Sequence, residues 1–345
     1  MLYKKLRTCV LCTFLFVIGF NIVSAQADSS YISIQEMRDK VPSTWTENLK
    51  GGKENFDCTI DAAVVVPEVD CFPVQTVTYP GKKTLKDSSF SFVEDTERGV
   101  FVKSVPDEKT DNSGSSGIVR MFEDSLSDET IAWADENARK IFLDTDMIND
   151  MKLERLGITE FREDDSAYQE FYVNYCPVYD GIGYLKYPSP MHSVKGYVEQ
   201  PCNLVYAFWV ENSEYKGAGI YVPQLNEKFL QDVPLLPFEQ IQDTIRQRIR
   251  DGYVQSICEI RLGYICVNDP EHPGENFYLT PGWVVCGVMN SRPDLPFHPE
   301  NYYPEQRYTG SQLVIDAQTG EIFDVYSRNK ETFDAHILTW DDVKK

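Results

Sequence analysis

Residues 310 to 327 read GSQLVIDAQTGEIFDVYS, with two apolar runs on either side of the pentapeptide from Asp316 to Gly320. Apolar and polar residues alternate within each run, as is typical of half-buried strands. Asp316 can accept hydrogen bonds from backbone N–H groups of its own turn, and Gly320 allows a positive φ at the end of a short hairpin loop. A calcium ion wants six or more oxygen ligands, and the loop offers one carboxylate. We therefore predict a hairpin with a structural turn, and a cation on Asp316 is the alternative.

A helix is predicted upstream of this hairpin, because Pro237 suits a first helical turn and Gly252 suits the position after a helix end. The apolar residues between them recur at helical spacing, at Phe238, Ile241, Ile245 and Ile249. Strand-like runs follow at 253–267 and 277–289, ahead of the hairpin. This part of the chain therefore reads helix, strand, strand, strand.

The same order is expected earlier in the chain. Ser125 or Ser127 can cap a helix with acidic residues in its first turn, and the apolar residues at helical spacing are Ile131, Ala134, Ala138 and Ile141. A second short helix is predicted over 147–156, ending at Gly157. Strand-like runs then occupy 171–179, 203–210 and 219–222. The sequence thus predicts two helix-β-β-β halves.

The N-terminal part differs from these halves. Residues 28–55 are polar, with a short helix expected around Ser33 to Arg38 and no strong pattern after it. Two β-branched runs at 62–66 and 74–78 flank a proline turn and predict a strand pair. The stretch 111–117 is rich in Ser and Gly and is expected to be a mobile loop.

We therefore expect an α+β protein in which an N-terminal strand pair precedes two helix-on-antiparallel-sheet halves. The predicted parts are a signal peptide at 1–25, an extension with the strand pair and mobile loop at 26–124, a first half at 125–230, and a second half with the C-terminal tail at 231–345. A chain of this length is compatible with two domains.

The first 27 residues are typical of an export signal. Lys4, Lys5 and Arg7 precede an apolar run from Cys9 to Val23, and small residues follow up to Ala25 and Ala27. The run is shorter than the roughly twenty residues that span a bilayer, so cleavage near Ala25 or Ala27 is favoured over an uncleaved membrane anchor. Neither cysteine of the leader follows a small residue as lipidation requires. The protein is expected to be secreted or extracytoplasmic.

The charge excludes one class of partner. The full chain carries a formal charge of −21, and cleavage after Ala25 removes two lysines and one arginine, giving −24. Such a field repels phosphate backbones and anionic membranes, so nucleic-acid binding is not expected and membrane contact is expected only through an uncleaved signal. The negative charge remains compatible with the binding of divalent cations or cationic partners.

Seven cysteines lie outside the leader, with no C-x-x-C among them, and the chain has four histidines, so no zinc site of ordinary spacing is predicted. Paired antiparallel residues have numbers with a constant sum. Loops centred near 271 or 272 and near 189 place Cys258 close to Cys286 and Cys176 close to Cys202. We expect disulfides between these two pairs, with buried thiols as the alternative.

No catalytic motif is recognisable, and neither a metal nor a cofactor is expected. Each candidate group has a plainer interpretation as loop, helix-end or core residues. The groups considered are His192; Asp269 with Glu271 and His272; Asp144 with Asp146; the acid pair Asp164 and Asp165; Ser115 in a Gly-Ser-Ser-Gly loop; and the aromatic residues Tyr206, Phe208, Trp209, Trp283, Tyr302 and Tyr303.

Residues Val314 to Ile322, VIDAQTGEI, resemble the closing hairpin of PepSY-type domains, small extracytoplasmic modules in which a helix packs on an antiparallel sheet. The paired halves also resemble two-lobed regulators of Gram-positive cell-wall signalling, and the whole exported chain is similar to uncharacterised secreted proteins and lipoproteins of Gram-positive gut bacteria. This resemblance implies a non-catalytic binding or inhibitory role and supplies no catalytic residues.

The sequence therefore favours an exported binding or modulating protein that acts on an extracellular protein or peptide. The alternatives are an extracellular hydrolase with carboxylates scattered along the sequence, and a surface protein that holds glycans on exposed aromatic residues.

Overall fold

The structure is a computed structural model. It describes residues 31–52, 56–78, 91–95, 99–103, 118–122, 126–143, 152–163, 169–185, 205–210, 214–220, 224–269, 277–289, 312–323 and 336–344. The chain divides into Met1–Ser30 and Tyr31–Lys345, and every described residue belongs to the second unit. The predicted signal peptide lies outside the described residues.

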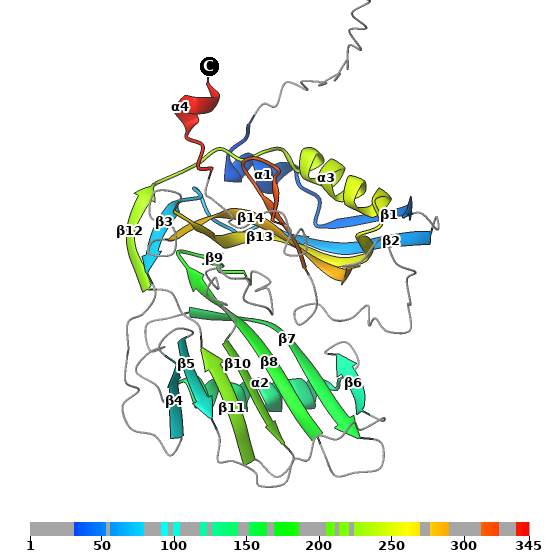
Figure 1. Cartoon of the computed structure of the whole chain (residues 1–345), viewed down its shortest axis with the longest axis vertical. Helices are drawn as coiled ribbons and strands as arrows, with labels where there is room; N and C mark the ends of the chain where they lie inside the picture. Colours follow the sequence, from blue (N-terminus) through cyan, green and yellow to red (C-terminus); the bar gives the residue numbers. More distant parts are fainter. Residues whose placement is uncertain are drawn as a thin grey trace, which may run out of the picture. The chain divides into compact units, whose positions relative to one another are not determined.

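Two large sheets carry most of the described chain (Figure 1). Sheet I has the order β1-β2-β13-β14-β15-β16, with β3 pairing β14 and β12 pairing β3. Its pairs are antiparallel except for β2 and β13, which run parallel. The strands are β1 (Thr44–Gly51), β2 (Phe56–Val65), β3 (Val74–Thr78), β12 (Gln224–Leu230), β13 (Val254–Asn268), β14 (Phe277–Met289), β15 (Gln312–Asp316) and β16 (Ile322–Phe323).

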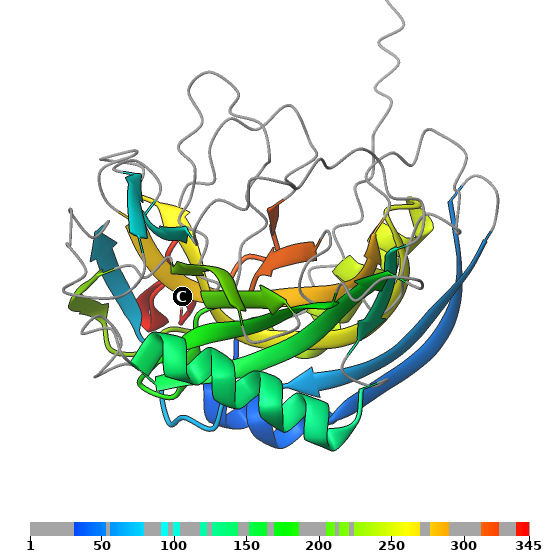
Figure 2. The ribbon, with the colours of Figure 1, turned by 90° about the horizontal axis from the view of Figure 1, so that it is seen from below.

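Sheet II has the order β4-β5-β11-β10-β8-β7-β6, with the short strand β9 pairing β8. Its strands are β4 (Ser91–Asp95), β5 (Gly99–Lys103), β6 (Ile118–Phe122), β7 (Lys152–Glu163), β8 (Gln169–Tyr179), β9 (Ile182–Gly183), β10 (Val205–Val210) and β11 (Glu214–Ile220). Helix α2 (Asp128–Leu143) lies against β8 and β10 (Figure 2). Ser127 caps it, since its Oγ accepts from the backbone N–H of Thr130 at 3.2 Å.

The remaining described helices are α1 (Ile34–Lys40), α3 (Phe238–Arg250) and α4 (Trp340–Val343). Ser33 and Glu36 form a capping box at the start of α1, which is the short helix expected near Ser33. Helix α3 begins directly after Pro237, and the glycine predicted to follow its end, Gly252, has φ of 87°. The four apolar residues that predicted this helix, Phe238, Ile241, Ile245 and Ile249, are all buried.

The largest core lies on the face of sheet I that α1 and α3 cover. Ile34 and Met37 of α1 and the apolar residues of α3 pack with strand residues such as Ile260 and Trp283, all of them buried. The ring centroids of Phe238 and Trp283 are 4.9 Å apart. Burial of this apolar area is the main term holding the helices on the sheet.

The α+β class is confirmed: the described chain is mostly strand with few helices. After α3, strands β13, β14 and β15 are neighbours in sheet I, which is the order predicted for the second half. In sheet II the three strands predicted after α2 correspond to β8, β10 and β11, but β7 and the short β9 also follow α2, so this part of the chain has more strands than the predicted helix-β-β-β half.

The predicted N-terminal strand pair is wrong as a pair. Both β-branched runs form strands, but β2 pairs with β1 and β13, whereas β3 pairs with β12 and β14. The strand β2 pairs instead with the adjacent β1 at eight positions, and β3 pairs with strands from far along the chain. Strands β1–β3 therefore belong to sheet I and β4–β6 to sheet II, so residues 31–122 are not a separate extension.

The short helix predicted over 147–156 is also wrong where the structure describes it. Residues from Lys152 onward form β7, which pairs with β8, and Gly157 lies next to a register shift after Arg155 instead of ending a helix. Pairing with a neighbouring strand overrides a local helical propensity of this size.

The β8–β9 hairpin joins the two sheets. Its turn has positive φ at Asp180 (52°) and Gly181 (86°), and the backbone N–H of Leu185 donates to the carbonyl O of Tyr264 at 2.9 Å. Residues of this hairpin, Tyr179, Ile182 and Tyr184, are buried in the core of sheet I. A β-carbon at position 263 would lie 2.5 Å from the carbonyl O of Gly183, so only glycine at that position allows this approach.

Candidate functional site

Strand β1 lies at one end of the described strand order of sheet I, and its sequence explains its two different faces. The buried or half-buried residues alternate with exposed ones along the strand. Trp45 is 7% exposed and its ring lies 6.3 Å from that of Phe238 on α3, and Leu49 packs against the same core. The alternate residues Thr44, Thr46, Asn48 and Lys50 are exposed on the opposite face.

The phase of the hydrogen-bond ladder shows which backbone groups of β1 face outward. The backbone N–H of Val64 donates to the carbonyl O of Ser43 at 2.8 Å, in the same register as the pair Thr44 and Ala63. Hydrogen-bonded pairs alternate along an antiparallel ladder. The odd-numbered residues of β1 therefore bond to β2, and the even-numbered residues direct their N–H and C=O groups away from it.

Among the described residues, β2 alone pairs with β1. The outward N–H and C=O groups of Thr44, Thr46, Asn48 and Lys50 thus form a regular row with a spacing that suits a further strand. The eight paired positions of β1 and β2 run from Thr44 to Gly51 without a register shift. An uninterrupted edge of this kind is a template for strand addition.

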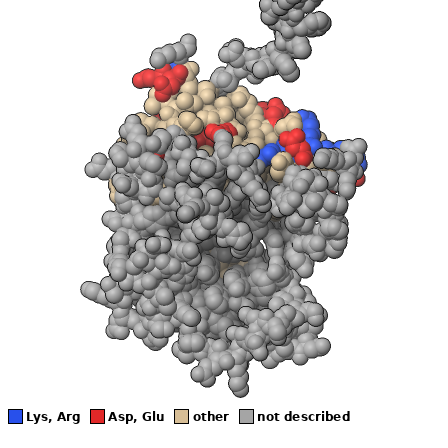
Figure 3. Space-filling model, in the orientation of Figure 1, with Lys and Arg blue, Asp and Glu red and all other residues tan. Residues whose placement is uncertain are grey.

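The exposed face beside this edge is polar. Cross-strand neighbours on it are Thr46 with Asp61, Asn48 with Thr59, and Lys50 with Asp57. Thr46 Oγ1 lies 3.5 Å from Asp61 Oδ1, and Lys50 forms an ion pair with Asp57. In Figure 3 charged atoms of both signs lie together where Figure 1 has the ends of α3, β1 and β2.

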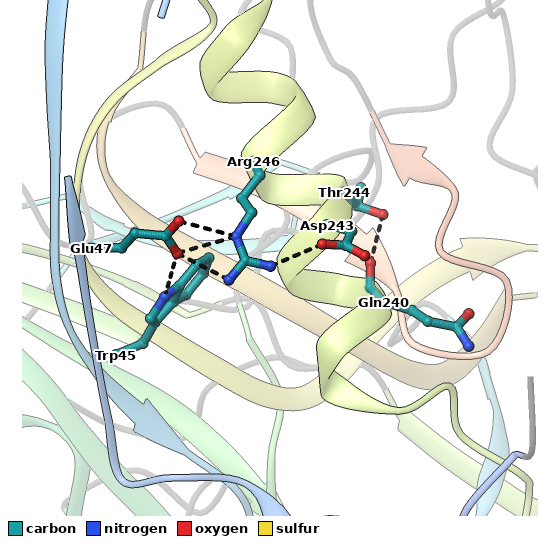
Figure 4. Close-up of polar contacts among 6 residues, drawn as sticks. All are labelled: Trp45, Glu47, Gln240, Asp243, Thr244 and Arg246. Carbon is teal, nitrogen blue, oxygen red and sulfur yellow. Dashed lines mark hydrogen bonds and ion pairs between the residues drawn. The ribbon is translucent and has the colours of Figure 1, made fainter. Parts of the chain in front are cut away.

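On the other face, a network from Arg246 fixes β1 to α3 (Figure 4). Arg246 Nε and Nη2 lie 3.1 and 3.0 Å from Glu47 Oε2, and Nη1 lies 2.8 Å from Asp243 Oδ1. The Trp45 Nε1–H donates to the same Glu47 oxygen at 3.0 Å, and the guanidinium carbon lies 5.2 Å from the centre of the Trp45 ring. The hydrogen bond to Glu47 raises the pKa of Arg246.

This network orders the strand rather than performing chemistry. Arg246 stays charged at any ordinary pH, and Glu47 is already occupied by three donors from Trp45 and Arg246. Holding an edge strand rigid lowers the entropy cost of adding another strand to it. The arrangement can therefore bind an extended chain without a reactive group.

The predicted turn at Asp316 forms as expected. Asp316 Oδ1 accepts from the backbone N–H groups of Gln318 at 2.7 Å and Thr319 at 2.9 Å, and Gly320 has φ of 71°. Asp316 is 4% exposed, and burial raises its pKa to about 6. In the part of the chain that the structure describes, no group of three His, Cys, Asp or Glu side chains is placed to hold a metal ion.

Cys258 and Cys286 lie close together but are not bonded in the structure. Cys258 lies at a register shift, Cys286 faces Glu259, and Cys258 Sγ is 3.5 Å from the carbonyl O of Cys286. Cys176 is a buried thiol, and Cys202 lies outside the described residues. Both disulfides stay predictions about the oxidised protein.

The remaining candidate groups are only partly described. Trp283 is fully buried, as core filling predicts, and Asp269 is buried at the end of β13. The side chains of Tyr206, Phe208 and Trp209 on β10 are not described. The candidates that lie outside the described residues are Ser115, Asp144, Asp146, Asp164, Asp165, His192, Glu271, His272, Tyr302 and Tyr303.

Strand β1 is the feature that the sequence analysis missed. A signal was present, because Trp45, Glu47 and Leu49 alternate with Thr44, Thr46 and Asn48 at a period of two. The polar composition of residues 28–55 outweighed this alternation. That no described strand pairs with the outer side of β1 depends on the order of strands in the sheet, which the sequence of β1 does not contain.

No family model and no curated protein matches this sequence. A solved structure that is similar is that of an uncharacterized protein from Eubacterium rectale ATCC 33656, with a TM-score of 0.52 at 15% sequence identity. The match covers 83% of this chain and 94% of that chain. At this identity the likeness concerns the fold, which the two chains share over most of their lengths.

Among the helices that the structure describes, none is both long and apolar enough to cross a membrane.

Proposed function

We propose that the chain is an exported, non-catalytic binding protein that captures an extended segment of an extracellular protein or peptide by adding it as a strand to β1. The row of outward backbone groups at Thr44, Thr46, Asn48 and Lys50 carries this proposal. Main-chain hydrogen bonds to such an edge supply affinity, and side chains on either face supply specificity.

Two features support an exported binding protein: the N-terminal leader and the order of helix and strands. The basic start and apolar run of the first 25 residues are typical of exported chains. The order of one helix and three neighbouring antiparallel strands, from α3 to β15, supports the resemblance to a PepSY-type half, which implies a binding or inhibitory role.

The net charge of the chain limits the kind of peptide segment that is expected to bind at β1. The chain carries a formal charge of −21, and the exposed face of β1 presents two threonines, an asparagine and a lysine that pairs with Asp57. Long-range attraction favours a neutral or basic segment over an acidic one. The partner is therefore expected to be an extended, uncharged or basic stretch of polypeptide.

The test uses residues 26–345 and a phage-displayed library of random twelve-residue peptides as the probe. The N–H of Thr46 points away from β2, so the variant Thr46→Pro removes one outward donor without removing a hydrogen bond to β2. Proline is tolerated at such a position of an edge strand. Thr46→Ala is the matched control, since it changes the side chain and keeps the N–H. Selected peptides are expected to bind the wild type and Thr46→Ala and to lose at least tenfold affinity for Thr46→Pro.

Hydrogen exchange of the bound complex locates the contact. The amides of Thr44, Thr46, Asn48 and Lys50 are expected to become protected by the peptide, while those of Trp45, Glu47 and Leu49 are protected already in the free protein. Equal binding to Thr46→Pro, with no added protection on β1, would falsify the assignment. Cleavage of the selected peptides, seen by mass spectrometry, would favour the hydrolase instead.

A further inference from the structure

The C-terminal segment, residues 336–344, contacts other described parts of the chain through Ile337, Leu338 and Trp340. It has no regular secondary structure from His336 to Thr339, where Thr339 is extended, and it ends in the short helix α4 (Figure 1). Residues 337–340 are half-buried, and Ile337 packs against the core of sheet I. The twelve residues 324–335 connect it to β16.

Gln318 binds the backbone of this segment. Its side chain is 1% exposed, its Nε2–H donates to the carbonyl O of Leu338 at 2.9 Å, and its Oε1 accepts from the backbone N–H of Leu338 at 3.3 Å. The same Nε2 donates to the carbonyl O of Pro234 at 3.0 Å. One amide side chain thus meets both backbone groups of Leu338, as a neighbouring strand would.

A side-chain contact follows two residues later. The Trp340 Nε1–H donates to Asp232 Oδ2 at 2.9 Å, and Asp232 Oδ1 accepts from the backbone N–H of Phe72 at 2.9 Å. A capping box between Thr339 and Asp342 lies within the segment and fixes the start of α4 beside Trp340. Backbone recognition at Leu338 and side-chain recognition at Trp340 therefore have a set spacing.

These contacts have the features of peptide recognition. The residues Asp232, Pro234 and Gln318, which we call the tail-binding site, lie before α3 and in the β15–β16 turn and are held by other parts of the chain. Leu236 N donates to the carbonyl O of Ala317 at 2.8 Å, and Ala317 N donates to the carbonyl O of Pro281 at 3.0 Å. The site is therefore ordered by bonds that do not involve the C-terminal segment.

We propose that the tail-binding site is a peptide-binding site occupied in cis by the chain's own C-terminal segment. Its ligand is an extended stretch whose backbone meets Gln318 and whose tryptophan, two residues later, donates to Asp232. We expect the segment to detach more easily than the buried strands, because its residues are half-buried or exposed and such segments open at low free energy. This site is separate from β1 and does not depend on the function proposed for that strand.

The linked segment keeps the site filled in the intact chain. A segment on a short linker has an effective concentration of about millimolar, so a free peptide at micromolar concentration competes poorly with it. Removal of the segment is expected to make the site available to the same peptide in trans.

The experiment uses residues 26–335 and a fluorescein-labelled peptide with the sequence of His336–Lys345 as the probe. Fluorescence anisotropy is expected to show saturable binding to the shortened chain and at least tenfold weaker binding to residues 26–345. Trp340→Ala in the peptide is expected to weaken binding at least tenfold. N-methylation at Leu338 removes the donor to Gln318 and is expected to do the same, whereas Leu338→Ala in the peptide has a smaller effect.

A second variant, which keeps all residues from 26 to 345, controls for the case in which the shortened chain does not fold. Trp340→Ala in residues 26–345 weakens the cis contact with every residue present, and it is expected to bind the labelled wild-type peptide more tightly than the unsubstituted protein does. Absence of binding to both proteins, or equal binding of the N-methylated peptide, overturns the proposal. Thr46→Pro is expected to leave this binding unchanged, so the result is independent of β1.

Discussion

Arg261 on β13 bonds Glu154 on β7, with Arg261 Nη1 at 2.6 Å from Glu154 Oε1, so one charged pair joins sheet I to sheet II. The Nε–H of Arg261 also donates to Glu259 Oε1 at 3.0 Å. The Glu259 side chain is 9% exposed, whereas that of Glu154 is 46% exposed. The charge of Glu259 is therefore stabilised by the arginine more strongly than the charge of Glu154, which is largely stabilised by water.

Replacement of this arginine by a neutral residue is expected to cost stability mainly through Glu259. Arg261→Met leaves a buried carboxylate without its cation, which typically costs about 3 kcal/mol in the free energy of unfolding. Glu154→Gln is the matched control and is expected to cost below about 1 kcal/mol, because its carboxylate is largely exposed. Urea denaturation of the two variants checks the difference, and equal losses would contradict the unequal roles.

Gly263→Ala is expected to loosen the contact between the β8–β9 hairpin and β13. The added methyl would overlap the carbonyl O of Gly183 and the side chain of Leu185, so the hairpin must shift. Overpacking of this kind typically costs about 1–3 kcal/mol. Thermal unfolding measures the loss, and hydrogen exchange at the Leu185 amide, which donates to Tyr264, should accelerate. An unchanged Leu185 amide would argue against this contact.

Asp316 is expected to make stability depend on pH. Burial raises its folded pKa to about 6, above the ordinary value of 3.8, so the native state keeps a proton that the unfolded chain loses between these pH values. The free energy of unfolding therefore falls as pH rises from about 4 to about 6, by up to about 3 kcal/mol for this group.

Asp316→Asn isolates this contribution, since the amide oxygen still accepts from Gln318 and Thr319. The variant is expected to lack the fall, and the difference between the two stability profiles over pH 4 to 7 measures it. Parallel profiles for wild type and variant would show that Asp316 titrates near its ordinary pKa.

The cysteines are expected to differ widely in reactivity. Burial raises the pKa of Cys58, Cys176 and Cys266 to about 12, so few of these thiols are ionised at pH 8. Cys71 is exposed and is expected to react first with iodoacetamide, with the three buried thiols labelled only after unfolding.

Peptide mapping of labelled, non-reduced protein also tests the disulfides predicted for Cys258 with Cys286 and Cys176 with Cys202. Their cross-linked peptides would show oxidation of the native protein. Fast labelling of Cys176 before Cys71 would contradict the burial of that thiol.

The sequence predicted those turns and helices that are stabilised by residues close to one another along the chain. The hairpin turn at Asp316 depends on its own backbone, and α3 depends on four apolar residues at helical spacing and on Gly252, so both could be found in the sequence. The strand order could not, because β13, which pairs with β2, and β12 and β14, which pair with β3, lie far along the chain. The tail-binding site was missed for the same reason, since Gln318 has no local signal for binding Leu338.

The parallel pairing of β2 with β13 has a consequence for how the chain acquires its structure. Ile60 finds its neighbour Ile257 only after most of the polypeptide has been synthesised, and contacts between distant segments slow folding. The β2 edge that faces β13 therefore stays unpaired until the second half of the chain emerges. For the exported chain that we propose, this late pairing favours passage through a translocation channel before folding is complete.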